Sequence, residues 1–279
     1  MNILFWNTGL SKNREGNSKR IIECIQEILI ENSVDLLILA EYPYDTQTLC
    51  TVSSALSAIQ YKSIPNYSKS YRIRGIINSK YNIESLQEQS RYQLVKINTS
   101  YYTLIVAMVH GKDKWNNDAS TREEGISIFS KDIYDHEQKH NCKYSIAIGD
   151  FNMDPFERSC IGSSGMHAIP FVDSVVKSSR IVNEREYQKF YNPTWKLFGN
   201  EKAPYTTYHL DRTGQVENFY WYALDQVIIR PALIEAFDEK KLEIITQTKS
   251  HNLLMKGKPN KDSYSDHLPL ICCLKEDLM

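Results

Sequence analysis

The segments Ser265-Asp266-His267-Leu268-Pro269-Leu270 and Gly149-Asp150-Phe151-Asn152 determine how the chain is interpreted. Each places polar side chains at the end of an apolar run: residues 144–148 lead into the second segment, and residues 268–274 continue the first. Such runs predict buried strands, and a strand end holds a polar side chain in a fixed position. An Asp beside a His at such a place indicates general acid–base or metal-assisted chemistry.

Further apolar runs predict the rest of a layered α/β fold. We expect strands at residues 3–6, 34–40, 71–77, 91–97, 101–109, 221–229 and 242–248, and helices at 19–31, 46–59 and 121–141. Residues 162–218 contain several prolines and glycines, so we expect an irregular stretch that shapes a substrate groove. No repeat or linker divides the sequence, which favours a single domain over residues 1–279.

The charge balance limits the kinds of partner. The chain has 33 Lys and Arg against 34 Asp and Glu, a net charge of -1. Proteins that bind nucleic acid through their net charge are usually strongly basic. Contacts with a polyanion would therefore come from local patches or from metal ions.

Cysteine usage and hydropathy predict the compartment. The six cysteines form no C-x-x-C pair, which favours reduced, mostly buried thiols. No apolar run approaches the roughly 20 residues of a membrane span, and residues 1–9 lack the features of a signal peptide. We therefore expect a cytoplasmic protein without membrane contact.

Eight polar residues end or interrupt the predicted strands. Four are carboxylates, two are amides and two are imidazoles: Asn7, Glu41, His110, Asp150, Asn152, Asp225, Asp266 and His267. Mg²⁺ prefers carboxylate and amide oxygens, while phosphoryl oxygens accept hydrogen bonds from imidazolium and amide groups. A buried, unpaired carboxylate is costly, so Asp225 within an apolar strand should have a partner. The set indicates hydrolysis of a phosphoester by water.

Six short motifs occur in an order that resembles one known superfamily. They are FWNTG (5–9), LAEYP (39–43), MVHG (108–111), GDFN (149–152), ALDQVII (223–229) and SDHLPL (265–270). Together they resemble the endonuclease/exonuclease/phosphatase superfamily, which has the DNase I-like fold. GDFNMDPFE (149–157) and YNPTW (191–195) are similar to a bacterial subgroup. The resemblance implies a four-layer α/β/β/α sandwich of two mixed, mainly antiparallel sheets flanked by helices.

The resemblance also implies roles for the metal side of the site. Glu41 would be the principal ligand of Mg²⁺ or Mn²⁺, with Asn7 close by and Asp266 contributing. No organic cofactor is expected. Here Glu41 follows Ala40 where many members have a glutamine, which matters little for the metal.

The remaining roles concern the scissile phosphate. His267 would act there as a general acid–base or as a stabilising cation, and Asp225 would fix its tautomer. Asp150 would orient or deprotonate the attacking water, or assist the leaving group. Asn152 and His110 would bind non-bridging oxygens. The Asp225 segment reads LDQV where many members have IDY or IDH, and the acid is kept.

Four residues are candidates for substrate binding, each with an alternative. Arg122 could reach a phosphate or pair with Glu123 or Glu124 at the start of a helix. Trp195 could stack a substrate or fill a core. Lys256 and Lys258 could contact a phosphate backbone or be solvated. The other histidines match no motif and are expected on the surface or in loops: His136, His140, His167, His209 and His251.

Three functions remain open from the sequence. The first is a metal-dependent phosphodiesterase that hydrolyses DNA or RNA by water attack. The second is a phosphatase or phosphodiesterase of a small molecule or lipid headgroup, although no exposed apolar hairpin for a membrane is evident. The third is a non-catalytic binding module, against which the complete residue set weighs.

Overall fold

Two large β-sheets pack face to face in the computed structural model, which describes residues 1–10, 15–56, 58–66, 72–214, 216 and 218–276. The six-stranded sheet has the spatial order β16 (Glu243–Ile244), β19 (Leu270–Cys273), β1 (Asn2–Asn7), β2 (Leu36–Ala40), β4 (Ile73–Asn78) and β3 (Tyr61–Ser63). The seven-stranded sheet has the order β5 (Asn82–Glu88), β6 (Tyr92–Asn98), β7 (Thr103–His110), β8 (Ser145–Asp150), β15 (Asp225–Ile229), β12 (Phe190–Tyr191) and β9 (Ala168–Ile169).

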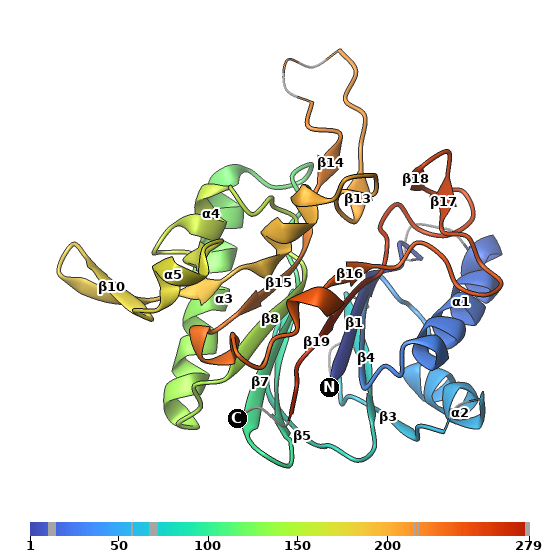
Figure 1. The fold of residues 1–279 in the computed structure, drawn as a ribbon, viewed down its shortest axis with the longest axis horizontal. Helices are drawn as coiled ribbons and strands as arrows, with labels where there is room; N and C mark the ends of the chain where they lie inside the picture. The colour runs from blue at the N-terminus through green and yellow to red at the C-terminus, as the bar shows by residue number, and fades with distance from the viewer. Residues whose placement is uncertain (11–14, 57, 67–71, 215, 217, 277–279) are drawn as a thin grey trace.

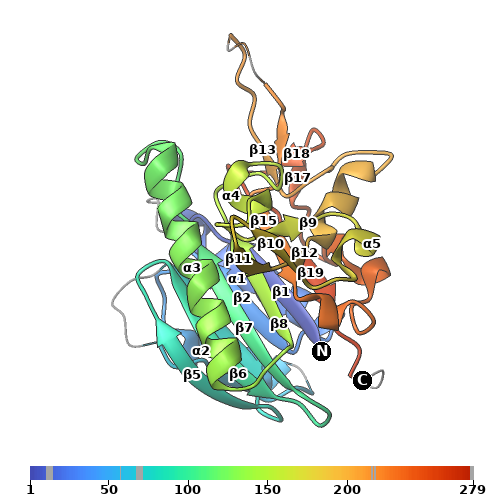
Figure 2. The ribbon, with the colours of Figure 1, turned by 90° about the vertical axis from the view of Figure 1, so that its left-hand side faces the viewer.

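Helices cover the outer faces of both sheets. Helices α1 (Ser18–Glu31) and α2 (Thr46–Leu56) lie on the six-stranded sheet, and α3 (Ala119–Lys139) lies on the seven-stranded sheet (Figures 1 and 2). Two short helices, α4 (Arg158–Ile161) and α5 (Val172–Val175), lie on the same side as α3 (Figure 1). The four-layer architecture expected from the resemblance is confirmed.

Strand pairing is mixed but mainly antiparallel. The pairs β1–β2, β7–β8 and β9–β12 are parallel, and the other pairs in the two large sheets are antiparallel. Within β1, Ile3 and Phe5 point into the core between the sheets, whereas Leu4 and Trp6 pack against the helices. A strand buried on both faces is apolar without interruption, which is why these runs stand out in the sequence.

The segment between β8 and β15 contains more regular structure than expected. A hairpin of β10 (Ser179–Val182) and β11 (Arg185–Gln188) projects from one side, and a second hairpin of β13 (Tyr208–His209) and β14 (Trp221–Tyr222) projects above the sheets (Figure 1). A 3₁₀ helix, η2 (Pro193–Gly199), follows β12. The expectation that residues 162–218 are irregular was therefore wrong in part.

Two predicted strands differ from the structure, and some observed strands were not predicted. The strand expected over residues 221–229 is divided into β14 and β15, because the Ala223 amide donates to Asp154 Oδ1 at 3.1 Å and the Leu224 carbonyl accepts from Phe151 at 2.8 Å. The strand expected over 242–248 is limited to β16, and β5 was not predicted. Residues 57 and 71, at the edges of two predicted elements, lie outside the described residues.

The described residues contain no helix that is long and apolar enough to cross a membrane. All six cysteines are buried and unpaired, as expected from their spacing. The remaining short elements are η1 (Glu15–Asn17), η3 (Pro231–Leu233), η4 (Glu239–Lys241), and a hairpin of β17 (Leu254–Met255) and β18 (Lys258–Pro259).

Candidate active site

Three of the predicted catalytic residues form a row across the seven-stranded sheet. His110 ends β7, Asp150 ends β8, and Asp225 begins β15. The register pairs His110 with Asp150 and Asp150 with Asp225. Parallel β7 and β8 end at the same edge, and antiparallel β15 starts there, so the row follows directly from the sheet topology.

The six-stranded sheet brings the other residues to the same edge. Asn7 ends β1, and Glu41 follows β2 with φ +52°, a conformation that is strained for a residue other than glycine. The Ser265 hydroxyl donates to the Asn7 carbonyl at 2.6 Å, and Trp6 Nε1 donates to the His267 carbonyl at 2.9 Å. These two bonds fix the turn before β19 on the end of β1.

Asp150 lies at the junction of the two sheets. Its Oδ2 accepts a hydrogen bond from Asn7 Nδ2 at 3.0 Å, and its Oδ1 accepts one from the Asn152 amide at 2.8 Å. His110 Nε2 lies 3.9 Å from Asp150 Oδ2 and 3.7 Å from Glu41 Oε1. Predicted site residues from distant parts of the sequence therefore meet around the Asp150 carboxylate.

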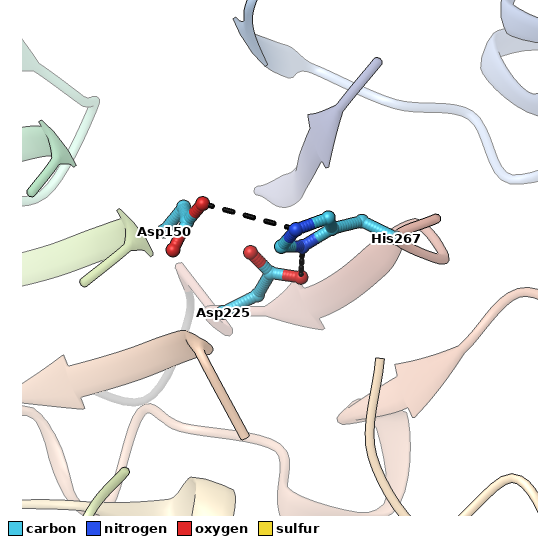
Figure 3. Close-up of side chains that lie close together, drawn as sticks. All are labelled: Asp150, Asp225 and His267. Carbon is cyan, nitrogen blue, oxygen red and sulfur yellow. Dashed lines mark hydrogen bonds and ion pairs between the residues drawn. The ribbon is translucent and has the colours of Figure 1, made fainter. Parts of the chain in front are cut away.

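Asp225 and His267 form a buried acid–imidazole pair, shown in Figure 3. His267 Nδ1 lies 2.8 Å from Asp225 Oδ2, and its Nε2 lies 4.0 Å from Asp150 Oδ2. The Tyr208 ring packs on His267 with centroids 4.6 Å apart. A carboxylate at Nδ1 requires a proton on that nitrogen, so Nε2 is the nitrogen presented toward Asp150.

Burial and neighbouring charges give the site unusual protonation. Burial lowers the pKa of His110 to about 4, although Glu41 opposes the shift. Burial alone would also lower the pKa of His267, but the carboxylates of Asp225, Asp150 and Asp266 raise it to about 10. Burial raises the pKa of Asp150 to about 7. At neutral pH His267 is therefore a cation beside a neutral His110.

These residues surround a pocket of about 230 Å³. Seven of the eight strand-end residues line it: Asn7, Glu41, His110, Asp150, Asn152, Asp266 and His267. Asp225 lies behind His267. A larger cavity of about 710 Å³ lies at the opposite ends of β7 and β8, around Thr103 and Tyr144, and the strand-end set does not line it.

The pocket has further lining residues that the sequence did not mark. Most come from loops and from the β13–β14 hairpin: Arg72, Arg91, Asp113, Lys114, Trp115, Asn116, Tyr208, Leu210, Arg212, Tyr222 and Leu224. The arginines give the pocket cationic groups for an anionic substrate. Except for Leu224, which lies in the ALDQVII motif, they belong to none of the motifs quoted above, because they reach the pocket through tertiary contacts.

The oxygen donors of this pocket fit a divalent cation. Glu41, Asp150 and Asp266 line the pocket and supply carboxylates, the donor type that Mg²⁺ and Mn²⁺ prefer. The Asn7 amide is directed differently, since its Nδ2 donates to Asp150 and its Oδ1 accepts from Gly9 at 3.1 Å. Its role as a metal ligand stays a prediction.

A second group of possible ligands, Asp150, Asp225 and His267, is less suited to a metal ion than the carboxylates that line the pocket. Asp150, Asp225 and His267 each offer a ligand atom within 4.8 Å of the other two. The 2.8 Å contact between Asp225 and His267 is a hydrogen bond, which a metal between them would have to replace. The assignment of Glu41 and Asp266 as metal ligands stays a prediction.

The four predicted substrate-binding residues are not among the described residues that line this pocket. Arg122 pairs with Glu157 at 3.2 Å rather than with a helix neighbour. Trp195 packs edge-on against Phe156 and beside Phe198. Lys256 lies between β17 and β18, and Lys258 begins β18. Their contact with substrate stays a prediction.

His167 lies in a loop just before β9, one of the two locations expected, but it is not at the surface. His167 is buried, its Nε2 accepts from Arg180 Nε at 2.7 Å, and its Nδ1 lies 3.2 Å from the Gln188 carbonyl. This pairing requires a neutral ring with the proton on Nδ1. His136 on α3 and His140 just after its end stack with ring centroids 5.9 Å apart, and His136 bonds to Gln87, away from the pocket.

Comparison with known proteins identifies the fold. No protein-family model and no curated protein matches the sequence. The Neisseria 3′ phosphatase NExo bound to a product DNA hairpin is 14% identical, with a TM-score of 0.57 over 99% of both chains. D. rerio TDP2 complexed with a single-strand DNA product is 14% identical, with a TM-score of 0.54 over 98% of this chain and 97% of that chain.

A third solved structure is an endonuclease/exonuclease/phosphatase family protein from Bacteroides thetaiotaomicron. It is 12% identical, with a TM-score of 0.58 over 100% of this chain and 98% of that chain. The chain has the DNase I-like fold of these proteins, as its motifs predict.

Proposed function

We propose that this chain is a divalent-metal-dependent phosphodiesterase that hydrolyses nucleic acid. The observation that carries the proposal is the His267–Asp225 pair, directed at Asp150 inside a pocket that combines carboxylates with arginines. A non-catalytic binding module would not need an oriented imidazole beside a buried carboxylate. The DNase I-like fold places these groups at one edge of two sheets.

Substrate binding follows from the cationic and neutral donors of the pocket. Arg72 and Arg91 are positioned to attract a phosphate group, and Arg91 Nη1 is held by the Gly111 carbonyl at 3.0 Å. Asn152 also donates to that carbonyl, at 3.2 Å, so both side chains share one backbone anchor. Neutral His110 can donate a hydrogen bond to a non-bridging oxygen.

The chemical step uses Asp150 and His267. Asp150 accepts a proton from a water molecule whose oxygen attacks phosphorus, while Asn7 and the Asn152 amide keep its carboxylate in place. The bond from phosphorus to the leaving oxygen breaks as the new one forms. The imidazolium of His267 stabilises the charge that develops on the phosphoryl oxygens, and Asp225 holds that ring.

We assign Glu41 and Asp266 as ligands of Mg²⁺ or Mn²⁺. Such an ion would add positive charge at the phosphoryl oxygens. The donor set of carboxylates supports a hard cation over one that prefers sulfur.

Nucleic acid is the substrate that the comparisons support. The NExo structure holds a product DNA hairpin, and the TDP2 structure holds a single-strand DNA product. A near-neutral chain can bind such a polyanion locally, through the pocket arginines, and a metal ion held by Glu41 and Asp266 would add to this attraction.

The test is cleavage of labelled single- and double-stranded DNA and RNA in Mg²⁺ or Mn²⁺, with EDTA as a control. We expect metal-dependent cleavage that His267→Ala removes and His140→Ala retains, since His140 lines the cavity at the opposite ends of β7 and β8 rather than the pocket. Intact polymers together with hydrolysis of a small phosphoester would assign the protein to small substrates. Full cleavage by His267→Ala would reject the proposed site.

A further inference from the structure

Arg212 lies between two aromatic rings at the pocket. Its guanidinium carbon is 5.3 Å from the centroid of Tyr222 and 5.9 Å from that of Trp115. All three residues line the pocket. Stacking of this kind orients a guanidinium by its faces and leaves its N–H edges available.

The donors of Arg212 have no partner in the part of the chain that the structure describes. Its Nε is enclosed without a hydrogen bond, and no described residue forms an ion pair with it. A guanidinium carries five N–H donors that match carboxylate and phosphate oxygens. Its two terminal nitrogens, Nη1 and Nη2, have no hydrogen bond with a described residue, so the edge that they form is free to bind an anion.

The Trp115 side of this arrangement is fixed by charged contacts. Lys114 pairs with Glu157 at 2.6 Å and with buried Asp154 at 3.5 Å. The Trp115 amide donates to Asp113 Oδ1 at 3.1 Å. Trp115 is 77% exposed, yet its backbone is held in place by this hydrogen bond.

The other side is connected to the catalytic imidazole. Tyr222 in β14 pairs with Tyr208 in β13, and the Tyr208 ring packs on His267. The loop after β7 and the β13–β14 hairpin are about a hundred residues apart in sequence, yet they contact each other through Arg212. Both segments therefore contribute to the wall of the pocket on this side.

We propose that the Arg212 bridge makes the site specific for the phosphoester at the end of a nucleic acid chain. A strand that continued past the scissile phosphate on this side would have to pass between Trp115 and Arg212. The pocket of about 230 Å³ is also smaller than the roughly 300–1,000 Å³ of pockets that enclose whole small molecules. The free edge of Arg212 binds the terminal phosphoryl oxygens. This inference rests on the proposed function.

The test compares linear and circular single-stranded DNA of one sequence, in Mg²⁺ or Mn²⁺. We expect the wild-type protein to process the linear DNA from an end and to leave the circle intact. The double variant Trp115→Ala/Arg212→Ala should raise the ratio of circle to linear cleavage about tenfold or more, because it removes both the barrier and a charge-assisted contact. The double variant Tyr101→Ala/Arg185→Ala alters exposed residues elsewhere and should keep the wild-type ratio.

Hydrolysis of bis(p-nitrophenyl) phosphate, with and without EDTA, separates this inference from the proposed function. This diester has no chain on either side of phosphorus, and it also reports whether a variant is folded. A wild-type protein that hydrolyses it and cuts the circle as fast as linear DNA would overturn the end specificity alone. If the wild-type protein hydrolyses this diester but leaves both DNAs intact, nucleic acid is rejected as the substrate, and the end specificity is rejected with it. No hydrolysis of any substrate would reject the proposed function.

Discussion

Replacement of Asp225 by Asn tests whether the buried acid–imidazole pair holds the catalytic group. Asp225 is 1% exposed and His267 is 4% exposed, with 2.8 Å between Oδ2 and Nδ1. Asn keeps the shape and one acceptor but loses the charge. A hydrogen bond to a charged group contributes about 1.5–3 kcal/mol, which corresponds to a loss of about 10- to 150-fold in kcat/KM.

The assay is kcat/KM of Asp225→Asn, His267→Ala and the double variant, on whichever substrate the cleavage test establishes. Asp225 acts through His267, so in the His267→Ala background the Asn substitution should change the rate by less than about twofold. NMR titration should also show a lower pKa for His267 in Asp225→Asn, because the Asp225 charge raises it. Equal losses in both backgrounds would refute the positioning role.

The remaining predictions concern the metal, stability and pH. Mn²⁺ should raise the melting temperature, because a ligand that binds the native state stabilises that state. Glu41→Gln should remove most of this rise, whereas Glu201→Gln, at an exposed position, should keep it. Arg230→Met should lower the free energy of unfolding by about 3–5 kcal/mol, because Glu137 would be left buried and unpaired. Urea unfolding measures this change. The double variant Arg230→Met/Glu137→Gln should recover much of the loss, because it also removes the buried charge. Burial lowers the pKa of His167 from 6.5 to about 4, so protonation favours the unfolded chain and stability should fall as pH drops from 6.5 toward 4. His167→Asn should weaken that dependence in thermal unfolding, and an unchanged slope would contradict the argument.

The row of His110, Asp150 and Asp225 could be predicted because each residue interrupts or ends an apolar strand. Burial on both faces makes such strands visible as continuous apolar runs, and their ends are therefore clear in the sequence. The register then places the three residues side by side. Sequence reasoning works here because local pattern and sheet topology give the same answer.

Arg212 and Tyr208 could not be predicted, because their position depends on contacts between distant segments. Tyr208 reaches the site through an isolated bridge to His267, 59 positions later in the numbering. Strands of two residues such as β13 and β14 leave almost no periodic signal. Edge strand β5 was missed for a related reason: its residues are partly exposed and form no apolar run.

The break between β14 and β15 illustrates a different limit. Residues 221–229 are apolar enough to predict one strand, but the backbone at Ala223 and Leu224 bonds to the loop after β8 instead. That loop carries Asp154, whose side chain accepts from Ala223. A side chain 69 positions away thus ends the strand, which no local pattern could reveal.

The pairing of β19 with β1 has a consequence for the order in which the site is assembled. The strand that follows His267 joins β1 through pairs such as Asn2 with Cys273, which are far apart in sequence. The row of His110, Asp150 and Asp225 depends instead on pairs within the other sheet, between β7, β8 and β15. Because strand pairing between residues distant in sequence is slow, the imidazole should join this row late in folding. A partly folded chain would therefore hold most of the pocket before it is able to catalyse the reaction.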